Sequence, residues 1–509
     1  FALLALLAVH HVALAEVEVP VLDVYRMVQY DQNERQFGSR RASVNMMAVS
    51  HKTSGDLSRK AVVLEFAQIN DALLDELLVE RSAGALFIVL PKTVDTVTEE
   101  VAAKWRTVEN SLIHREIPIP VYFTFDSDHA QQLRSIIDTR SEDTQLVVSG
   151  DTSIARGGSI PGVNIQATIQ GAGPAGADAP DSPIIAVVAH YDAFAVSPEL
   201  AVGADSNGSG VTALLQLARI FWRLYNRGRA HGGHSLIFLL TAGGKMNYGG
   251  AKQWLRSTDS ALLEKIEFAL CLDSIGLGDS LNLHVSKPAK DATVAKYFRA
   301  LSESARRAGV EVNLVHKKIN VSDPVVAWEH EPFSRRRVLA GTLSRHSSPL
   351  ASTRATALDR KVEPAALDRN IRIIANALAG VIYGTGADHQ LFNESSPAEL
   401  AFVDAWSGAL ASTPRMGAYI ENGAARVLLD RAEAVLSAAS TETKRQSFSV
   451  ESDRSFFRGS FKARVSVYTV RPFSFDLIMS VCVVAYLGAL LVLLQGKEEA
   501  RRTVTGLLR

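Results

Sequence analysis

The most apolar stretches of the chain lie at its two ends. Residues 1–15 read FALLALLAVHHVALA and contain no charged residue. This run is short for a bilayer span, and its final Ala-Leu-Ala has the small-x-small pattern of a signal-peptidase site. We therefore predict a signal peptide over residues 1–15, truncated at its start because it lacks an initiator Met and a basic segment. The alternative is a buried N-terminal helix, which would have little to pack against.

The second apolar run, residues 477–494, reads LIMSVCVVAYLGALLVLL and also lacks charge. It is long enough to cross a bilayer as a helix, and it shows no polar face such as a core helix would have. We predict a transmembrane helix over residues 475–495 and a cytosolic tail over 496–509. Basic residues are balanced on the two sides of the span, so the signal peptide decides the orientation. A single-pass type I protein follows, with its bulk in the lumen of the endoplasmic reticulum or outside.

Three Asn-x-Ser sequons agree with a lumenal location. They begin at Asn207, Asn320 and Asn393, and each is a candidate site for N-linked glycosylation. Because such triplets also arise by chance, they add weight to the lumenal assignment without deciding it.

The chain between the two apolar ends alternates short apolar runs with amphipathic ones. In residues 16–155, the runs 61–64, 85–90 and 121–123 predict strands, and 71–81 and 98–112 predict helices that start at the capping residues Asp71 and Thr98. This alternation indicates a lumenal α/β subdomain.

A second α/β unit is predicted over residues 156–386. Nearly continuous apolar runs at 184–189, 236–240, 268–272 and 281–285 predict buried strands, and 211–225 and 364–383 predict helices. Such strands separated by helices indicate a mixed, mostly parallel sheet flanked by helices. Residues 387–474 predict two helices, 397–411 and 424–439, and a strand-like segment, 455–470, that leads into the membrane span.

Composition excludes two classes of protein. The 54 Lys and Arg balance the 54 Asp and Glu, so the chain lacks the basic excess of a protein that neutralises nucleic-acid phosphates. Only two cysteines are present, Cys271 and Cys482, and the second lies inside the predicted span. A disulfide framework and a cysteine-based zinc module are both excluded.

The chemistry of the second unit gathers where its strands end. His190 and Asp192 follow the first strand, Asp205 lies in the Gly-rich segment 203–210, Asp273 follows a later strand, and His346 comes later still. In an open α/β sheet, side chains beyond the carboxyl ends of the strands share one crevice. Imidazoles and carboxylates in such a set are typical of a two-zinc hydrolase.

This ordered set resembles the M28 family of co-catalytic zinc aminopeptidases over residues 160–384. The resemblance implies that His190, Asp205, Asp273 and His346 stand at zinc-ligand positions and that Asp192 orients the site. The family's Glu-Glu pair, a general base followed by a zinc ligand, falls on Gly244 and Lys245. Gly244 cannot accept a proton, and the Lys245 ammonium has no lone pair to offer a metal. We therefore expect no catalytic residue, no bound metal and no cofactor, with Lys245 taking the place of a metal ion by pairing with Asp205 and Asp273.

A signal peptide, a degenerate M28-like unit and a single C-terminal span together resemble the nicalin and nicastrin group. The nicalin-like branch fits better, through stretches such as HYDAFAVSPELAVGADSNGSG and VVAWEHEPFSRRR and through a single lumenal cysteine. The resemblance implies a non-catalytic scaffold in the endoplasmic reticulum membrane. Its implied partners are Nodal modulator (NOMO), a small multi-spanning membrane protein and the ribosome-bound translocon for multipass proteins, with a role in Nodal signalling. The alternatives are an active M28 zinc aminopeptidase and a nicastrin-like substrate receptor of an intramembrane protease.

Overall fold

The structure is a computed structural model, and it describes most of the 509-residue chain. The described ranges are 21–139, 144–149, 153–172, 182–226, 232–288, 290–384, 390–420, 423–469 and 473–496. The predicted signal peptide, and the predicted tail from residue 497 onward, lie outside these residues.

The N-terminal unit contains a closed barrel in which three neighbouring strand pairs are parallel. Around the barrel the strands are β1 (Val21–Arg26), β20 (Lys462–Thr469), β9 (Thr144–Ser149), β4 (Asn45–Ser50), β5 (Lys60–Glu65), β6 (Ala85–Leu90) and β8 (Val121–Phe125). Strands β4, β5, β6 and β8 run parallel to their neighbours in this series, and β1, β20 and β9 pair antiparallel. The α/β character predicted for residues 16–155 agrees with this arrangement.

Three helices cover the barrel strands. They are α2 (Asp71–Asp75), α3 (Glu99–Ile113) and α4 (Asp128–Thr139). Alternate strand residues face opposite ways, so Leu86 and Ile88 pack with α3, whereas Phe87 packs with α4. Thr98 caps α3 as predicted, by accepting from Val101 N. The cap of α2 is Asn70 and not Asp71, because the Asn70 side chain accepts from Leu73 N.

A small sheet joins the barrel to the rest of the molecule. Its order is β10 (Ile154–Arg156), β19 (Arg454–Gly459), β2 (Gln29–Gln32), β3 (Arg35–Ser39) and β7 (Glu116–Ile117). Strands from the start and the end of the chain thus lie side by side in it, since β19 pairs with β2.

The second unit is built on an eight-stranded mixed sheet. Its order is β16 (Glu311–His316), β15 (Ser280–Val285), β17 (Ala340–Ser344), β14 (Ile266–Leu272), β12 (Ile184–His190), β13 (Ser235–Thr241), β11 (Ile160–Ile169) and β18 (Glu442–Val450). The central strands β17, β14, β12 and β13 are parallel, and β11 and β18 add antiparallel at one side. This is the predicted flanked α/β sheet.

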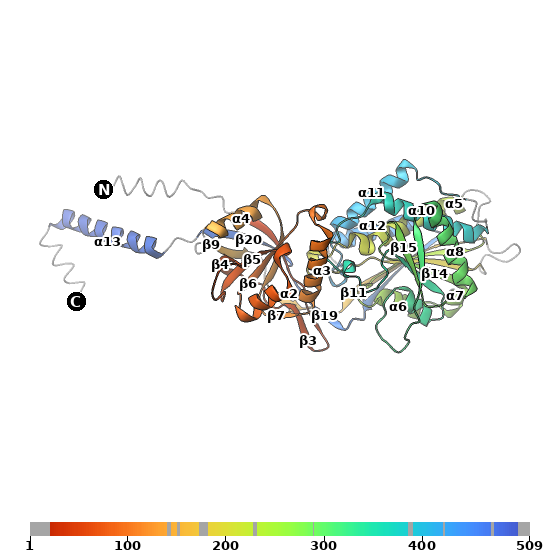
Figure 1. The fold of residues 1–509 in the computed structure, drawn as a ribbon, viewed down its shortest axis with the longest axis horizontal. Helices are drawn as coiled ribbons and strands as arrows, with labels where there is room; N and C mark the ends of the chain where they lie inside the picture. The colour runs from red at the N-terminus through yellow and green to blue at the C-terminus, as the bar shows by residue number, and fades with distance from the viewer. Residues whose placement is uncertain are drawn as a thin grey trace.

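Helices cover both faces of this sheet (Figure 1). One face carries α5 (Gly210–Tyr225), α8 (Ala292–Arg307), α10 (Pro364–Tyr383), α11 (Pro397–Ser412) and α12 (Ala424–Ala438), and the other carries α6 (Gly249–Ser257), α7 (Ser260–Lys265) and α9 (His330–Arg335). Val187 of β12 packs toward the first group and Val188 toward the second. Burial on both faces explains why these strands read as unbroken apolar runs.

Residues 387–474 do not form the separate region that the sequence predicts. Helices α11 and α12 cover the eight-stranded sheet, β18 extends that sheet, β19 joins the small sheet and β20 completes the barrel. The predicted strand 455–470 is therefore two strands of different sheets. Hydropathy cannot show this distribution, because the pairing partners lie hundreds of residues away.

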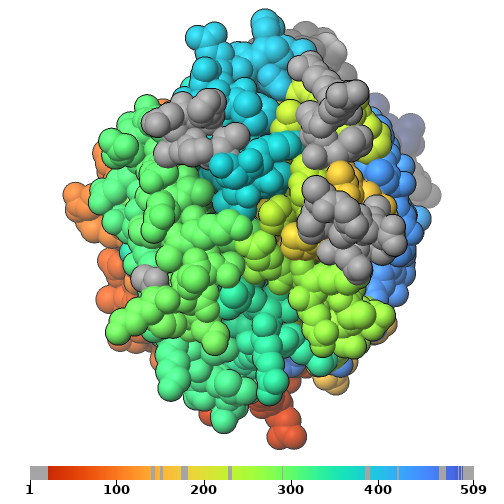
Figure 2. Space-filling model, turned by 90° about the vertical axis from the view of Figure 1, so that its right-hand side faces the viewer, coloured from red at the N-terminus to blue at the C-terminus, as the bar shows by residue number. Residues whose placement is uncertain are grey.

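The chain ends in α13 (Phe473–Gln495), which begins four residues after β20 ends at Thr469. Its segment Leu477–Leu494 has a mean hydropathy of 2.8 and none of it is buried in the protein, so it is long and apolar enough to cross a membrane. Figure 1 shows α13 beyond the barrel, away from the eight-stranded sheet. Figure 2 views the opposite end, formed mainly by the green and cyan segments of the eight-stranded unit.

Candidate functional site

The predicted site residues gather at the carboxyl ends of the parallel strands. His190 ends β12, Asp273 follows β14 and His346 comes two residues after β17 ends at Ser344. Asp205 lies in the turn that leads into α5, and its Oδ1 accepts from Gly276 N at 2.8 Å, which ties it to the loop after Asp273. All four side chains are buried.

The turn after β13 leaves no room for the family's general base. A Cβ atom on Gly244 would lie 2.2 Å from the His190 ring. Gly243, with φ at +66°, turns the chain, and the backbone N–H groups of Gly244 and Lys245 donate to the two Asp192 oxygens at 2.6 and 2.9 Å. Asp192 thus fixes a turn in which the His190 ring lies against the glycine.

A residue that the sequence analysis missed holds the His190 ring. His190 Nδ1 lies 3.2 Å from Glu329 Oε2, and Glu329 Oε1 accepts from Thr241 Oγ1 at 2.6 Å. His190 and Glu329 are fully or almost fully buried, and His190 Nε2 has no hydrogen-bond partner among the described residues. Glu329 lies in the stretch VVAWEHEP before α9, where no strand end or spacing marks it.

Two arginine side chains form ion pairs with Asp205 and Asp273, the carboxylates at the expected zinc-ligand positions. Arg345 Nε donates to Asp205 Oδ2 at 2.6 Å, and Arg354 Nη2 donates to Asp273 Oδ2. Arg354 also donates to the Tyr248 hydroxyl at 2.9 Å and lies 4.5 Å from the centre of the Trp328 ring. A guanidinium suits this task, because its planar donor fork stays charged when buried.

The charges around Asp273 together affect its pKa more strongly than its burial does. Burial alone would raise the pKa of Asp273, but the cations Arg354 and Lys245 hold that pKa well below its usual range. Asp359 shows the opposite balance. Burial and the neighbouring Asp205 raise the pKa of Asp359 to about 6, although its oxygens accept from Asp205 N and Ser206 N at 2.9 Å.

The predicted pairing of Lys245 with the two carboxylates is wrong. Lys245 Nζ donates to Ser206 Oγ at 2.7 Å, and the ion pairs of Asp205 and Asp273 are formed by the arginines instead. Lys245 still acts on the site through its charge. Burial and nearby Arg354 lower the pKa of Lys245 to about 8 against the pull of Asp273.

His346 is also held within the protein. Thr353 Oγ1 lies 3.4 Å from both of its ring nitrogens, and its carbonyl accepts from His284 Nε2 at 2.7 Å. Burial, followed by the charge of Arg345, lowers the pKa of His346 to about 3, so its ring is neutral at neutral pH.

These residues do not fit the zinc pair of an M28 hydrolase. Both carboxylates are bound by guanidinium groups, the Glu-Glu positions hold Gly244 and Lys245, and the His190 ring is bound to Glu329. Within the described ranges, no group of three or more His, Cys, Asp or Glu side chains is placed to hold a metal ion. The guanidinium groups of Arg345 and Arg354 lie against the carboxylates that would have to bind a metal.

The three sequon asparagines differ in their exposure to solvent. Asn320 and Asn393 are exposed on loops, whereas Asn207 is fully buried. Its Nδ2 donates to the His190 and Leu272 carbonyls at 3.1 and 2.7 Å. A glycan on Asn207 is therefore incompatible with this fold, because the amide nitrogen that would carry it crosslinks two strand ends.

Comparison with known proteins gives the family. The chain is 35% identical to the human BOS complex subunit NCLN over 95% of its own length and 91% of that protein. It is 28% identical to nicalin of Caenorhabditis elegans over 75% of its own length and 73% of the relative. The chain belongs to the nicalin family. Residues 164–377 also match peptidase family M28, so the chain carries an M28-like unit. Among solved structures, the aminopeptidase from Aneurinibacillus sp. strain AM-1 aligns with 71% of the chain and 84% of that protein, at 14% identity and a TM-score of 0.33.

Proposed function

We propose that the chain is a non-catalytic, membrane-anchored subunit of a BOS-type complex in the endoplasmic reticulum, with its M28-like unit in the lumen. The observation that carries the proposal is the pairing of Arg345 with Asp205 and of Arg354 with Asp273. These pairs lie at the positions where a peptidase of the M28 family would bind metal, and Gly244 stands at the position of the general base without a side chain that could accept a proton. Similarity to the BOS complex subunit NCLN over nearly the whole chain supports the assembly.

The partners belong to the same proposal. We assign the chain to a complex with Nodal modulator and a small multi-spanning membrane protein, at the ribosome-bound translocon that inserts multipass proteins. A role in Nodal signalling goes with this assignment. The order β20 then α13 supports a single-span anchor, because the folded region leads directly into an apolar helix long enough to cross a membrane. The type I orientation rests on the predicted signal peptide.

Affinity isolation from detergent-solubilised membranes tests the assembly. The full-length chain, tagged after residue 509, is expected to co-isolate with a Nodal modulator, a multi-spanning membrane protein and ribosomal subunits. A variant whose α13 is replaced by an unrelated apolar span is the matched control for capture through detergent alone. Recovery of presenilin-type proteins without ribosomes would instead show a nicastrin-like receptor and overturn the proposal.

A further inference from the structure

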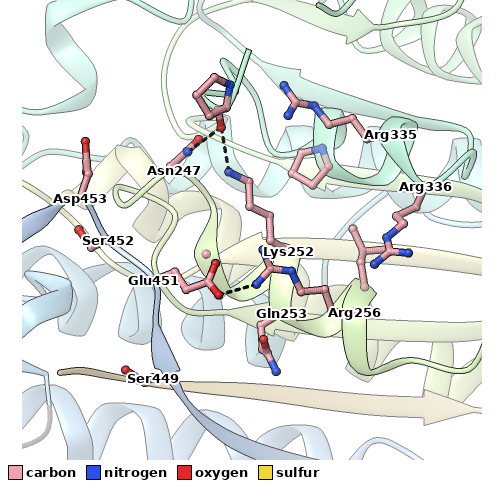
Figure 3. Close-up of a pocket in the computed structure, with 14 residues that line it drawn as sticks. Asn247, Lys252, Gln253, Arg256, Arg335, Arg336, Ser449, Glu451, Ser452 and Asp453 are labelled. Atoms are coloured by element: carbon pink, nitrogen blue, oxygen red, sulfur yellow. Dashed lines mark hydrogen bonds and ion pairs between the residues drawn. The ribbon is translucent and has the colours of Figure 1, made fainter. Parts of the chain in front are cut away.

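A groove on the side of the eight-stranded unit lies apart from the M28-like site. It has a volume of about 660 Å³ and is formed by α6, α9, the loop before α9 and the β18–β19 connection (Figure 3). Its lining includes four cations and two carboxylates, Lys252, Arg256, Arg335, Arg336, Glu451 and Asp453. The groove therefore has an excess of positive charge.

Three of its cations form no ion pair with a carboxylate among the residues that the structure describes. Arg256 pairs with Glu451 at 2.8 Å, and Figure 3 shows this contact across the groove. Lys252 Nζ reaches only the Pro324 carbonyl, at 3.4 Å, and Arg335 donates only to main-chain carbonyls while its Nε is buried without a partner in the described part of the chain. The exposed Arg336 side chain makes no ion pair there. Such unpaired cations in a partly closed space favour binding of an anion.

The cations also act on one another. Burial lowers the pKa of Lys252, and the charges of Arg335 and Arg256 lower it further, against the smaller opposing effects of Glu451 and Glu331. An anion placed between Lys252 and Arg335 would relieve this repulsion. A neutral or basic ligand would leave it unchanged.

Two features around the groove suit an extended peptide. Ser449 of β18 lines the groove, and β18 is the last strand of its sheet, with no described strand paired to its outer edge. An open strand edge offers main-chain hydrogen bonds to an added strand. On the loop that supplies Pro324, Val321 and Val325 are 70% and 63% exposed, which provides apolar contacts beside the cations.

We propose that this groove binds an extended acidic segment of a lumenal partner protein. The segment lies along the β18 edge, places carboxylates against Lys252, Arg335 and Arg336, and places apolar side chains against Val321 and Val325. The acidic, extended character of the segment rests on the charge of the groove, the β18 edge and the exposed valines. Only the lumenal location of the partner rests on the proposed function.

Fluorescence anisotropy with the full-length protein in detergent tests the assignment. The probe is a fluorescein-labelled octapeptide of alternating Glu and Val, with an alternating Lys and Val octapeptide as its basic counterpart. We expect saturable binding of the acidic probe that weakens with salt, no binding of the basic probe, and a loss of at least tenfold in affinity in Arg336→Glu and in Lys252→Glu.

Arg299→Glu is the matched control, because Arg299 is an exposed cation of α8 on the other face of the sheet. It is expected to leave the affinity unchanged. An equal loss in this variant, or no saturable binding of the acidic probe, would overturn the proposal. Inorganic phosphate that displaces the probe at a concentration as low as the unlabelled peptide would also overturn it, since the groove would then be a site for small anions.

Discussion

Arg354 donates a charge-assisted hydrogen bond to Asp273, whose carboxylate is buried beyond the end of β14 while the Arg354 side chain is 11% exposed. A buried carboxylate without a partner is costly, so this arginine is what allows an acidic residue to remain at a vacated ligand position. The same holds for Arg345 and Asp205. In the M28-like unit, the two arginines thus compensate the charge of both carboxylates.

Removing one member of the pair should destabilise the protein strongly. Arg354→Met leaves Asp273 buried and unpaired, with an expected loss of about 3–5 kcal/mol in the free energy of unfolding. The double variant Arg354→Met with Asp273→Asn should recover most of this loss, because it removes both charges. Thermal unfolding monitored by tryptophan fluorescence measures the effect.

The control for this pair is Arg369→Met. Arg369 pairs with Asp279, whose side chain is 76% exposed, so its loss should cost no more than about 1 kcal/mol. Equal destabilisation by Arg354→Met and Arg369→Met would show that the buried pair has no special role.

Gly244 should be intolerant of any side chain. Its added Cβ would overlap the His190 ring, which is itself held by Glu329, so Gly244→Ala should cost about 1–3 kcal/mol by overpacking. Gly408→Ala is the matched control. Gly408 lies inside α11 with open space around its Cα, so alanine there should stabilise the helix by about 0.5–1 kcal/mol. Chemical denaturation of the two variants, side by side, decides the point, and a neutral Gly244→Ala would refute the packing account.

Glu109 should make stability depend on pH. It is buried at the junction of the two units, where α3 meets the M28-like unit, and it accepts from Val196 N and Ala357 N at 3.1 and 2.8 Å. Burial raises the pKa of Glu109 to about 7, against the opposing effect of these hydrogen bonds. A raised pKa means that the folded state favours the protonated form. Its stabilising contribution is complete below the unfolded pKa of about 4.3 and is lost as the pH rises through 7.

Glu109→Gln removes this titration and keeps the side-chain size. Relative to the variant, the unchanged protein should lose roughly 2–3 kcal/mol of stability between pH 5 and pH 8. Unfolding curves recorded across that range give the difference directly. A constant difference at all pH values would mean that the pKa of Glu109 is the same in the folded and unfolded protein, which would contradict the raised folded pKa.

The three sequons should differ in glycosylation. In cells that glycosylate lumenal proteins, Asn320→Gln and Asn393→Gln should each remove one glycan from the folded protein, seen as a mobility shift that glycosidase treatment abolishes. Asn207→Gln should cause no shift, because Asn207 is buried and bound to the strand ends. A glycan found on Asn207 of the folded protein would contradict the structure.

The strands and helices of the eight-stranded unit could be predicted because the hydropathy pattern within each segment indicates its burial and its period. The predicted helix 364–383 coincides with α10, and the predicted strand 281–285 lies within β15. The barrel could not be predicted, because it closes only when β20, near the end of the chain, pairs with β1 at its start.

Some residues of the site could also be predicted from the sequence, and others could not. His190 and Asp273 could be placed because a buried strand ends beside each of them. Arg354 and Glu329 could not, because they lie in connections whose paths are set by tertiary packing. Arg345 directly follows β17, a strand that was not predicted from the sequence. The resemblance to the M28 family places one cation, Lys245, at the site, and for this reason the sequence predicts the compensating charge there.

Zinc analysis of the purified full-length protein tests the central claim most directly. After exposure to excess Zn²⁺ and removal of the free ion, elemental analysis is expected to find far less than one zinc per chain, and the protein should hydrolyse no aminoacyl p-nitroanilide above background. Two zinc ions per chain, together with hydrolysis that a chelator abolishes, would show a working metallopeptidase and contradict the account.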